Sequence, residues 1–172
     1  MDSNVVRVEG DGMGNGEVGD RAAAVGYRVR FRDDRLVLDA WSPNRAECVA
    51  QAVRGLVEGV VRSGVTAPCE QTVEWIRPES DPDLLAGALR RVITRLETCG
   101  QVPADIEIVE DADGGVTLVM VMVQVAEVNV LPVAAPVADD VVFEHVGGGW
   151  RCHVIVDVRA GEHAWRRIPG GE

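Results

Sequence analysis

Asp157 is the strongest candidate for a functional residue in this 172-residue chain, because it is a carboxylate near the end of an otherwise apolar strand. It belongs to the stretch 134–158, in which two β-favouring runs flank the glycines at 147–149 and so predict a hairpin. Alternation places Asp157 on one strand face with Arg151 and His153, opposite a face of valines. A carboxylate there needs water, a cation or hydrogen bonds to stay ionised. Pairing with a nearby arginine is the alternative to binding a metal ion.

The other reactive residue types form no catalytic constellation in the sequence. Cys152 and His153 are adjacent in a predicted strand and point to opposite faces, which prevents them from acting together as nucleophile and base. The four cysteines are widely spaced and contain no C-x-x-C pair: Cys48, Cys69, Cys99 and Cys152. We also find no phosphate-binding loop and predict that the chain is not an enzyme.

Hydrophobic periodicity predicts the elements that must position these residues. Strands are predicted at 27–32, 36–41, 72–76, 106–108, 116–128, 141–143 and 150–158. Two apolar stripes at helical spacing predict one helix from Asn44 to about residue 61 and a second from Asp81 to Gly100. Asn44 with Glu47 fits a capping box, and Asp81 is the predicted cap of the second helix. The fold class is therefore α+β, with two amphipathic helices packed on one sheet of about seven strands.

Composition predicts one acidic domain with a tail at each end. Residues 1–24, rich in glycine and acidic side chains, are predicted to be a disordered tail, 25–158 the domain and 159–172 a C-terminal tail. A net charge of −11 and the absence of basic residues interleaved with the tryptophans argue against strong direct nucleic-acid binding. The start has no secretory leader and no stretch suits a bilayer, so we expect a cytoplasmic protein that does not bind membranes.

Three local sequences, in order and at matching spacing, resemble the archease family. Residues 26–53, GYRVRFRDDRLVLDAWSPNRAECVAQAV, follow a family pattern that opens with G-Y, passes H-T-A-D and continues through E-A-W/Y into a helix. Residues 83–96 are similar to the family helix that carries D-L-E-x-L-L. Residues 148–158, GGWRCHVIVDV, are close to the family ending G-G-W-x-A-x-V-I-x-D-V/I. The resemblance covers about residues 26–158 and implies a mixed sheet that carries two helices.

The resemblance implies an accessory protein whose partner is another protein. Archeases promote guanylation and turnover of a GTP-dependent RNA ligase that seals tRNA and other RNA ends, and a chaperone-like role is also proposed for them. The implied partner is therefore an RNA ligase. The alternative is an archease-fold binding or structural protein that has lost metal binding and ligase activation.

The resemblance also implies a divalent cation at one end of the sheet, held by the Asp of H-T-A-D and the Asp near the C-terminus. Asp157 matches the second position, but an alignment without gaps puts Arg35 at the first, and a shift of one residue would bring Asp34 there. The implied ligands are Asp34 and Asp157, with Asp33 and Asp139 as additional carboxylates. The cation would be calcium, or manganese or magnesium, and the alternative is that none binds.

Further departures from the family pattern surround this site. The family's Lys before the penultimate strand falls on or near Ala134 and is therefore lost. Family members end directly after the matching Asp, whereas this chain continues for fourteen residues beyond Val158. Asp39 stands at a family Glu position and is interpreted as a solvent-facing strand residue. We therefore expect an inherited scaffold with a rebuilt functional end.

Overall fold

The computed structural model describes residues 6–9, 24–63 and 67–161. The helices are α1 (Arg45–Val60) and α2 (Asp81–Cys99), and a 3₁₀ turn, η2, spans Ala138–Asp140. The strands are β1 (Val6–Glu9), β2 (Gly26–Arg32), β3 (Arg35–Ser42), β4 (Val61–Ser63), β5 (Glu70–Ile76), β6 (Gln101–Glu110), β7 (Val116–Gln124), β8 (Glu127–Val128), β9 (Val130–Pro132), β10 (Val141–Val146) and β11 (Gly149–Ala160).

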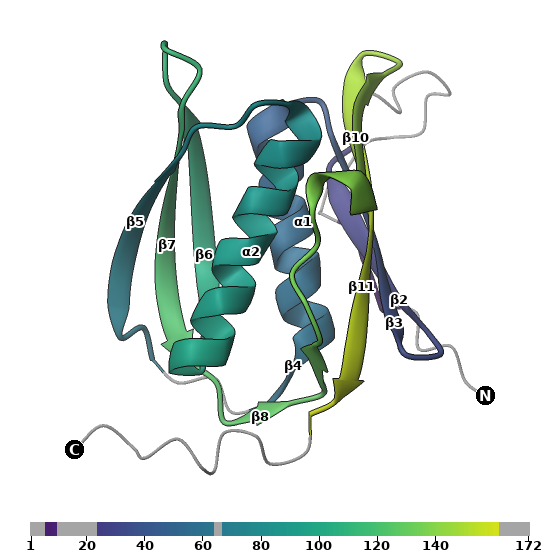
Figure 1. Cartoon of the computed structure of the whole chain (residues 1–172), viewed down its shortest axis with the longest axis vertical. Helices are drawn as coiled ribbons and strands as arrows, with labels where there is room; N and C mark the ends of the chain where they lie inside the picture. The colour runs from purple at the N-terminus through teal and green to yellow at the C-terminus, as the bar shows by residue number, and fades with distance from the viewer. Residues whose placement is uncertain (1–5, 10–23, 64–66, 162–172) are drawn as a thin grey trace.

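Both helices lie between two sheets, so that the molecule has three layers (Figure 1). One sheet has the order β1-β2-β3-β11-β10, with β9 also paired to β11, and the other has the order β5-β7-β6. A short β4–β8 ladder lies at one end of the helices. All pairings between the described strands are antiparallel. The predicted α+β class with two amphipathic helices is confirmed, although the strands divide among three sheets instead of forming one.

Helix α1 explains why two large sheets are needed. None of its residues is exposed, and its buried positions spread around much of its circumference. It packs against β2 and β3 on one side and against β6 on the other. Helix α2, by contrast, keeps Arg90, Thr94 and Glu97 exposed on one face. A helix that is apolar on several sides needs a partner on each of them, and only a layer on both sides of α1 provides that.

Two glycines let α1 approach the six-stranded sheet closely. A Cβ added at Gly55 would run into the side chain of Leu38, and one added at Gly59 would lie 2.6 Å from Leu36 Cδ1. Gly55 and Gly59 are four residues apart and therefore lie on the same face of the helix. The backbone of α1 thus rests directly on the apolar side chains of β3.

The start of α1 has the predicted cap but only half of the predicted capping box. Asn44 Oδ1 accepts a hydrogen bond from Glu47 N at 3.2 Å. The Glu47 carboxylate does not return to the Asn44 N–H and instead accepts from Gln51 and Arg54, each at 2.8 Å. The Asn44 N–H donates to Ser42 Oγ at 3.1 Å, so a different side chain satisfies that donor.

The start of α2 is capped by Ser80, one residue before the predicted cap. Ser80 Oγ accepts a hydrogen bond from Asp83 N at 3.2 Å. Asp81 lies inside the first turn, where its carboxylate pairs with Arg45 at 2.5 Å. Serine and aspartate are both good caps, so their adjacency did not reveal which one would cap the helix. The predicted end is confirmed, because Gly100 adopts a left-handed conformation with φ 65°.

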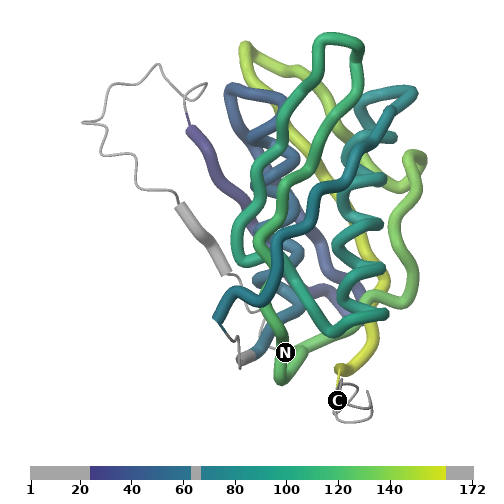
Figure 2. The backbone as a smooth tube through the Cα atoms, turned by 90° about the vertical axis from the view of Figure 1, so that its left-hand side faces the viewer, coloured from purple at the N-terminus to yellow at the C-terminus, as the bar shows by residue number. Residues whose placement is uncertain are grey.

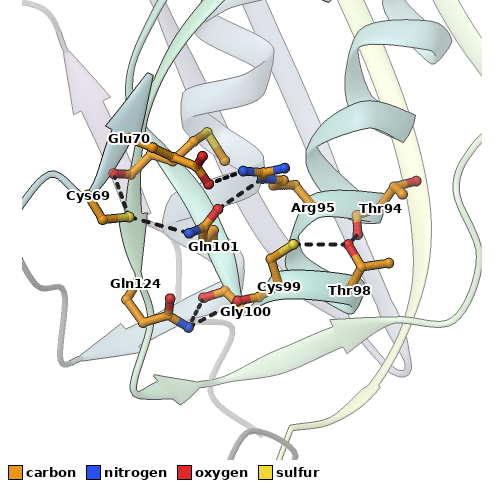
Figure 3. Close-up of polar contacts among 10 residues, drawn as sticks. Cys69, Glu70, Thr94, Arg95, Thr98, Cys99, Gly100, Gln101 and Gln124 are labelled. Atoms are coloured by element: carbon orange, nitrogen blue, oxygen red, sulfur yellow. Dashed lines mark hydrogen bonds and ion pairs between the residues drawn. The ribbon is translucent and has the colours of Figure 1, made fainter. Parts of the chain in front are cut away.

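Polar side chains fasten the C-terminal end of α2 to the three-stranded sheet (Figure 3). Arg95 pairs with Glu70 of β5 and donates to Gln101 of β6 at 2.9 Å. Gln101 in turn donates to Cys69 Sγ at 3.4 Å. The far end of this sheet carries the β6–β7 hairpin, visible at the top of Figure 2. Its predicted glycine turn is confirmed by Gly114, which has φ 88°.

The two predicted tails fall mostly outside the described residues. Within the N-terminal segment, β1 pairs with β2, and residues 1–5 and 10–23 are not described. At the other end, β11 continues to Ala160, two residues beyond the predicted strand, and residues 162–172 are not described. In the part of the chain that is described, neither helix is both long and apolar enough to cross a membrane.

Candidate functional site

Three chain segments meet at the end of the six-stranded sheet where Asp157 lies, and we call them the tip: residues 32–35, 133–140 and 155–158. Backbone hydrogen bonds join the segments. Val158 N donates to the Asp34 carbonyl at 2.8 Å, and Val133 N donates to the Asp157 carbonyl at 2.8 Å. The turn between β2 and β3, the end of β11 and the segment after β9 therefore hold fixed positions relative to one another.

Asp157 and Arg35 form an ion pair across two neighbouring strands. They are direct partners in the antiparallel β3–β11 register, and Arg35 Nε lies 3.4 Å from Asp157 Oδ1. Both side chains are open to solvent, with 63% of Arg35 and 71% of Asp157 exposed. The predicted alternation along β11 is confirmed, since Cys152, Val154 and Val156 are buried on the opposite face. Asp157 thus lies beside a guanidinium group at a solvent-exposed end of the sheet.

A pocket of about 260 Å³ lies beside this ion pair. Its lining includes Arg35, Asp157, Ile155 and Asp140, together with the apolar stretch 134–136. Asp139, the neighbour predicted to join the tip carboxylates, is exposed and does not line the pocket. Within η2, Asp140 Oδ2 accepts a hydrogen bond from Val137 N at 3.1 Å, which directs its carboxylate back toward its own turn. The choice between the two adjacent aspartates depends on this 3₁₀ turn.

The tip residues do not fit a resident divalent cation. In the described part of the chain, no group of three or more His, Cys, Asp or Glu side chains is arranged to hold a metal ion. Asp33 and Asp34 are exposed on their turn, and the guanidinium of Arg35 already supplies a positive charge beside Asp157. Calcium takes six to eight oxygen ligands, and magnesium demands near-ideal octahedral geometry. The ligand set of Asp34 and Asp157 stays a prediction, and Arg35, which follows Asp34 in the sequence, pairs with Asp157.

A second polar cluster lies on the outer face of the same sheet. His153 Nδ1 lies 2.7 Å from Asp39 Oδ1, and Arg30 Nη2 lies 3.4 Å from Asp39 Oδ2. Asp39 is 26% exposed, so it faces outward as interpreted but is bound on both sides. The sequence analysis missed this link. The alternation in each strand was visible, but only the register of β3 with β11 makes Asp39 and His153 neighbours.

The buried cysteines offer no nucleophile. Cys48 of α1 and Cys152 of β11 are both fully buried free thiols. A hydrogen bond with Cys48, reinforced by burial, raises the pKa of Cys152 well above its ordinary value. The Cys152 thiol therefore stays protonated at neutral pH, and a protonated thiol is neither a metal ligand nor a nucleophile.

The chain has relatives among curated proteins. No family model matches the chain. Two curated Mycobacterium tuberculosis proteins, one from each of two strains and both described as probable archease, are 30% identical to it over 145 residues. The alignment covers 83% of this chain and 80% of each relative.

Solved structures share the fold at low sequence identity. The solution structure of Methanobacterium thermoautotrophicum protein 1598 has a TM-score of 0.53 at 16% identity and covers 77% of this chain and 98% of that protein. The crystal structure of a Thermotoga maritima protein described as an archease and possible chaperone has a TM-score of 0.51 at 14% identity. It covers 70% of this chain and 88% of that one.

Proposed function

This chain belongs to the archease family, and from that premise we propose that it is an accessory protein that acts on a partner enzyme, a GTP-dependent RNA ligase of tRNA splicing. The observation that carries the proposal is the 30% identity to probable archeases over 145 residues, which spans most of both chains. The likeness to the structure described as an archease and possible chaperone supports the same scaffold. We expect the protein to work in the cytoplasm, where such a ligase would meet its RNA.

The tip is the surface that we assign to the partner. It presents the exposed Asp157 and Arg35 side chains beside a pocket, on a backbone held by hydrogen bonds. A carboxylate and a guanidinium 3.4 Å apart can exchange their mutual ion pair for contacts with charged groups of another protein. Because the tip does not fit a resident cation, it would act through these charges alone.

One observation favours a second candidate, a binding or structural protein of the same fold that no longer activates a ligase. The Arg35–Asp157 ion pair neutralises the carboxylate that the resemblance marks as a metal ligand. The family's Lys is also replaced by alanine near position 134. In this second candidate, the protein still binds a partner but no longer activates a ligase.

The test measures guanylation and multiple-turnover RNA joining by the RNA ligase of the same organism, with and without the full-length chain, in manganese and in magnesium. The proposal expects faster turnover with the chain present. Asp157→Asn should abolish the stimulation, because it removes the charge at the tip. Glu107→Gln is the matched control, since Glu107 is an exposed carboxylate on β6 of the other sheet and should leave the stimulation intact.

The outcomes separate the two candidates. Stimulation that is lost in Asp157→Asn and kept in Glu107→Gln supports the accessory role through the tip. Co-purification of the ligase without any change in its rate supports the binding protein. No change in rate and no co-purification would remove the RNA ligase as the partner.

A further inference from the structure

The outer face of the six-stranded sheet gathers arginines in a protein that is acidic overall. We call this surface the arginine face, and it consists of Arg28, Arg30 and Arg32 of β2, Arg35 of β3 and Arg151 of β11. Strand alternation places these side chains opposite the residues that pack on the helices, such as the buried Val29. The whole chain has 17 basic residues against 28 acidic ones, so five arginines on one face are a strong local departure.

Three of these arginines carry charge that the described residues do not neutralise. Arg30 and Arg35 are paired with Asp39 and Asp157, each at 3.4 Å. The exposed side chains without an ion pair in the described ranges are those of Arg28, Arg32 and Arg151. Glu144 of β10 stands opposite Arg151 in the register but forms no ion pair with it. The face thus carries five arginines against Asp39, Asp157 and Glu144, while Asp33 and Asp34 are exposed on the adjoining β2–β3 turn.

A pocket of about 780 Å³ adjoins the arginine face. Arg28 and Arg151 line it together with Trp41 and Trp150. The lining also includes one carboxylate, that of Asp39, which is paired with Arg30. Trp41 and Arg151 are direct partners in the β3–β11 register, so both lie on the outer face. A volume between about 300 and 1,000 Å³ is typical of sites that take small organic groups. Indole rings beside guanidinium groups suit a flat aromatic group that carries a negative charge nearby.

We propose that the arginine face and this pocket bind a single-stranded polynucleotide. A base would stack on Trp41 in the pocket, and phosphates would pair with Arg28, Arg151 and Arg32. Stacking on an aromatic side chain beside a cationic track is how proteins hold single strands without reading their sequence. Alternate residues of β2 lie about 6.6 Å apart along the strand, so its arginines form a regular track. The acidic remainder of the surface repels phosphates and confines the strand to this face.

The net charge of the chain predicted no strong nucleic-acid binding, and this proposal differs from that prediction. A net charge of −11 averages over the whole surface and hides the segregation of arginine that strand alternation produces. It also goes beyond the proposed function, because polynucleotide binding needs neither a ligase nor Asp157. Tip variants leave Arg28 and Arg151 in place, so the two proposals can fail separately.

The experiment measures fluorescence anisotropy of labelled 12-nucleotide single strands of mixed sequence, one RNA and one DNA, titrated with the full-length chain. Titrations at about 50 mM and 200 mM salt give the salt dependence of the affinity. The test variant is Arg28→Gln with Arg151→Gln. The matched control is Arg77→Gln with Arg90→Gln, which removes the same charge from exposed arginines off the arginine face. A third variant, Trp41→Leu, removes the stacking ring, and circular dichroism checks that each variant is folded.

Binding of either strand that weakens at least tenfold in Arg28→Gln/Arg151→Gln, and less than twofold in the control, supports the proposal. The salt slope should fall by about 1.4, because each lost phosphate contact contributes about 0.7 for a single strand. Trp41→Leu should weaken binding about fivefold or more. Absence of binding at low salt, or equal losses in the test and control variants, would overturn it. So would binding of poly-glutamate as tight as that of the strands, since the face would then serve an acidic protein.

Discussion

The Asp157 carboxylate and the Arg35 guanidinium share one end of the sheet, and their pairing sets what the tip can bind. Because both side chains are more than half exposed, the pair itself adds at most about 1 kcal/mol to stability. The ion pair has a larger effect on which ligands the tip can bind. A divalent cation would have to displace an arginine and would still find too few oxygen ligands.

Calcium or manganese should therefore leave the thermal stability of the protein unchanged. A ligand that binds only the folded state raises the melting temperature in proportion to ln(1 + [L]/Kd). Scanning calorimetry with and without about 1 mM of each metal chloride measures this, with Arg35→Ala as a companion variant. A clear rise in melting temperature for the natural chain that disappears in Asp157→Asn would show a cation site at the tip after all.

Glu58 gives the stability a pH dependence of known sign. Burial raises the pKa of this carboxyl, which accepts a hydrogen bond from the Tyr27 hydroxyl, above its ordinary value of 4.5. Between the unfolded and folded pKa values the folded state holds more protons, so stability falls as the pH rises. The contribution of Glu58 is fully present below pH 4.5 and is lost as the pH passes through the raised pKa.

Urea unfolding at several pH values between about 4 and 7.5 checks this for the natural chain and Glu58→Gln. The glutamine keeps an oxygen that can accept from Tyr27 but cannot ionise. The natural chain should lose stability relative to the variant as the pH rises. A difference between the two chains that stays constant with pH, or one that changes in the opposite direction, would contradict the assignment.

The sequence predicted the positions of single residues correctly where strand alternation determines them. It did not do so where a turn determines them. The placement of Asp157 and Cys152 on opposite faces of one strand follows from alternation, and it was predicted. The choice between Asp139 and Asp140 depends on a 3₁₀ turn that no periodic signal marks. The Asp39–His153 contact depends on which strands pair, and β3 and β11 are more than a hundred residues apart in the chain.

At the scale of elements, glycines in the two helices have opposite roles. Gly55 in α1 lies where a Cβ would meet Leu38 and Tyr27 of the sheet. Gly87 in α2 has room for a methyl group, because a Cβ there would make ordinary van der Waals contacts with Arg91 and Ile76 at 3.6 Å or more. Both interrupt a helix, where glycine is about 1 kcal/mol less favourable than alanine.

Gly55→Ala should therefore destabilise the protein, while Gly87→Ala should leave it unchanged or stabilise it by up to about 1 kcal/mol. Overpacking at Gly55 costs about 1–3 kcal/mol and exceeds the gain in helix propensity. Urea unfolding of both variants beside the natural chain measures the two changes in free energy. Equal stabilisation by both substitutions would mean that α1 does not rest as closely on β3 as described.

The two helices and the longer strands were predictable, whereas the short strands β1, β4, β8 and β9 and the assignment of elements to layers were not. The predicted strands and both helices are present, since hydrophobic period distinguishes a strand from a helix. The hydrophobic period indicates only that one face of an element is buried. It does not indicate which other element covers that face. The stripe on α1 was visible in the sequence, yet its burial on nearly every side needs a second sheet that only β5, β6 and β7 supply.

At the scale of the whole molecule, the two large sheets share one continuous core. The buried cluster includes Leu38 and Val154 of one sheet, Leu118 and Met120 of the other and the helix residues between them. Neither sheet can keep its apolar face covered without the helices, so we expect the layers to unfold together.

Tryptophan fluorescence can test this cooperativity. A variant that keeps only Trp75 reports on the three-stranded sheet, and a variant that keeps only Trp150 reports on the six-stranded sheet, where its ring lies 5.2 Å from that of Phe143. Each variant is followed in urea by fluorescence and by circular dichroism, which monitors the whole fold. The two signals should give the same midpoint within each variant. A separation between them would show that one sheet unfolds before the other.

The placement of both helices between sheets has a consequence for how such a protein can change over evolutionary time. Each sheet has one face that the core requires and one that it does not. Substitutions on the free faces can alter charge and shape while the packing around α1 stays constant, because alternation separates the two kinds of position along every strand. A lineage can thus exchange one binding partner for another without passing through unfolded intermediates, which makes this architecture a tolerant starting point for new interactions.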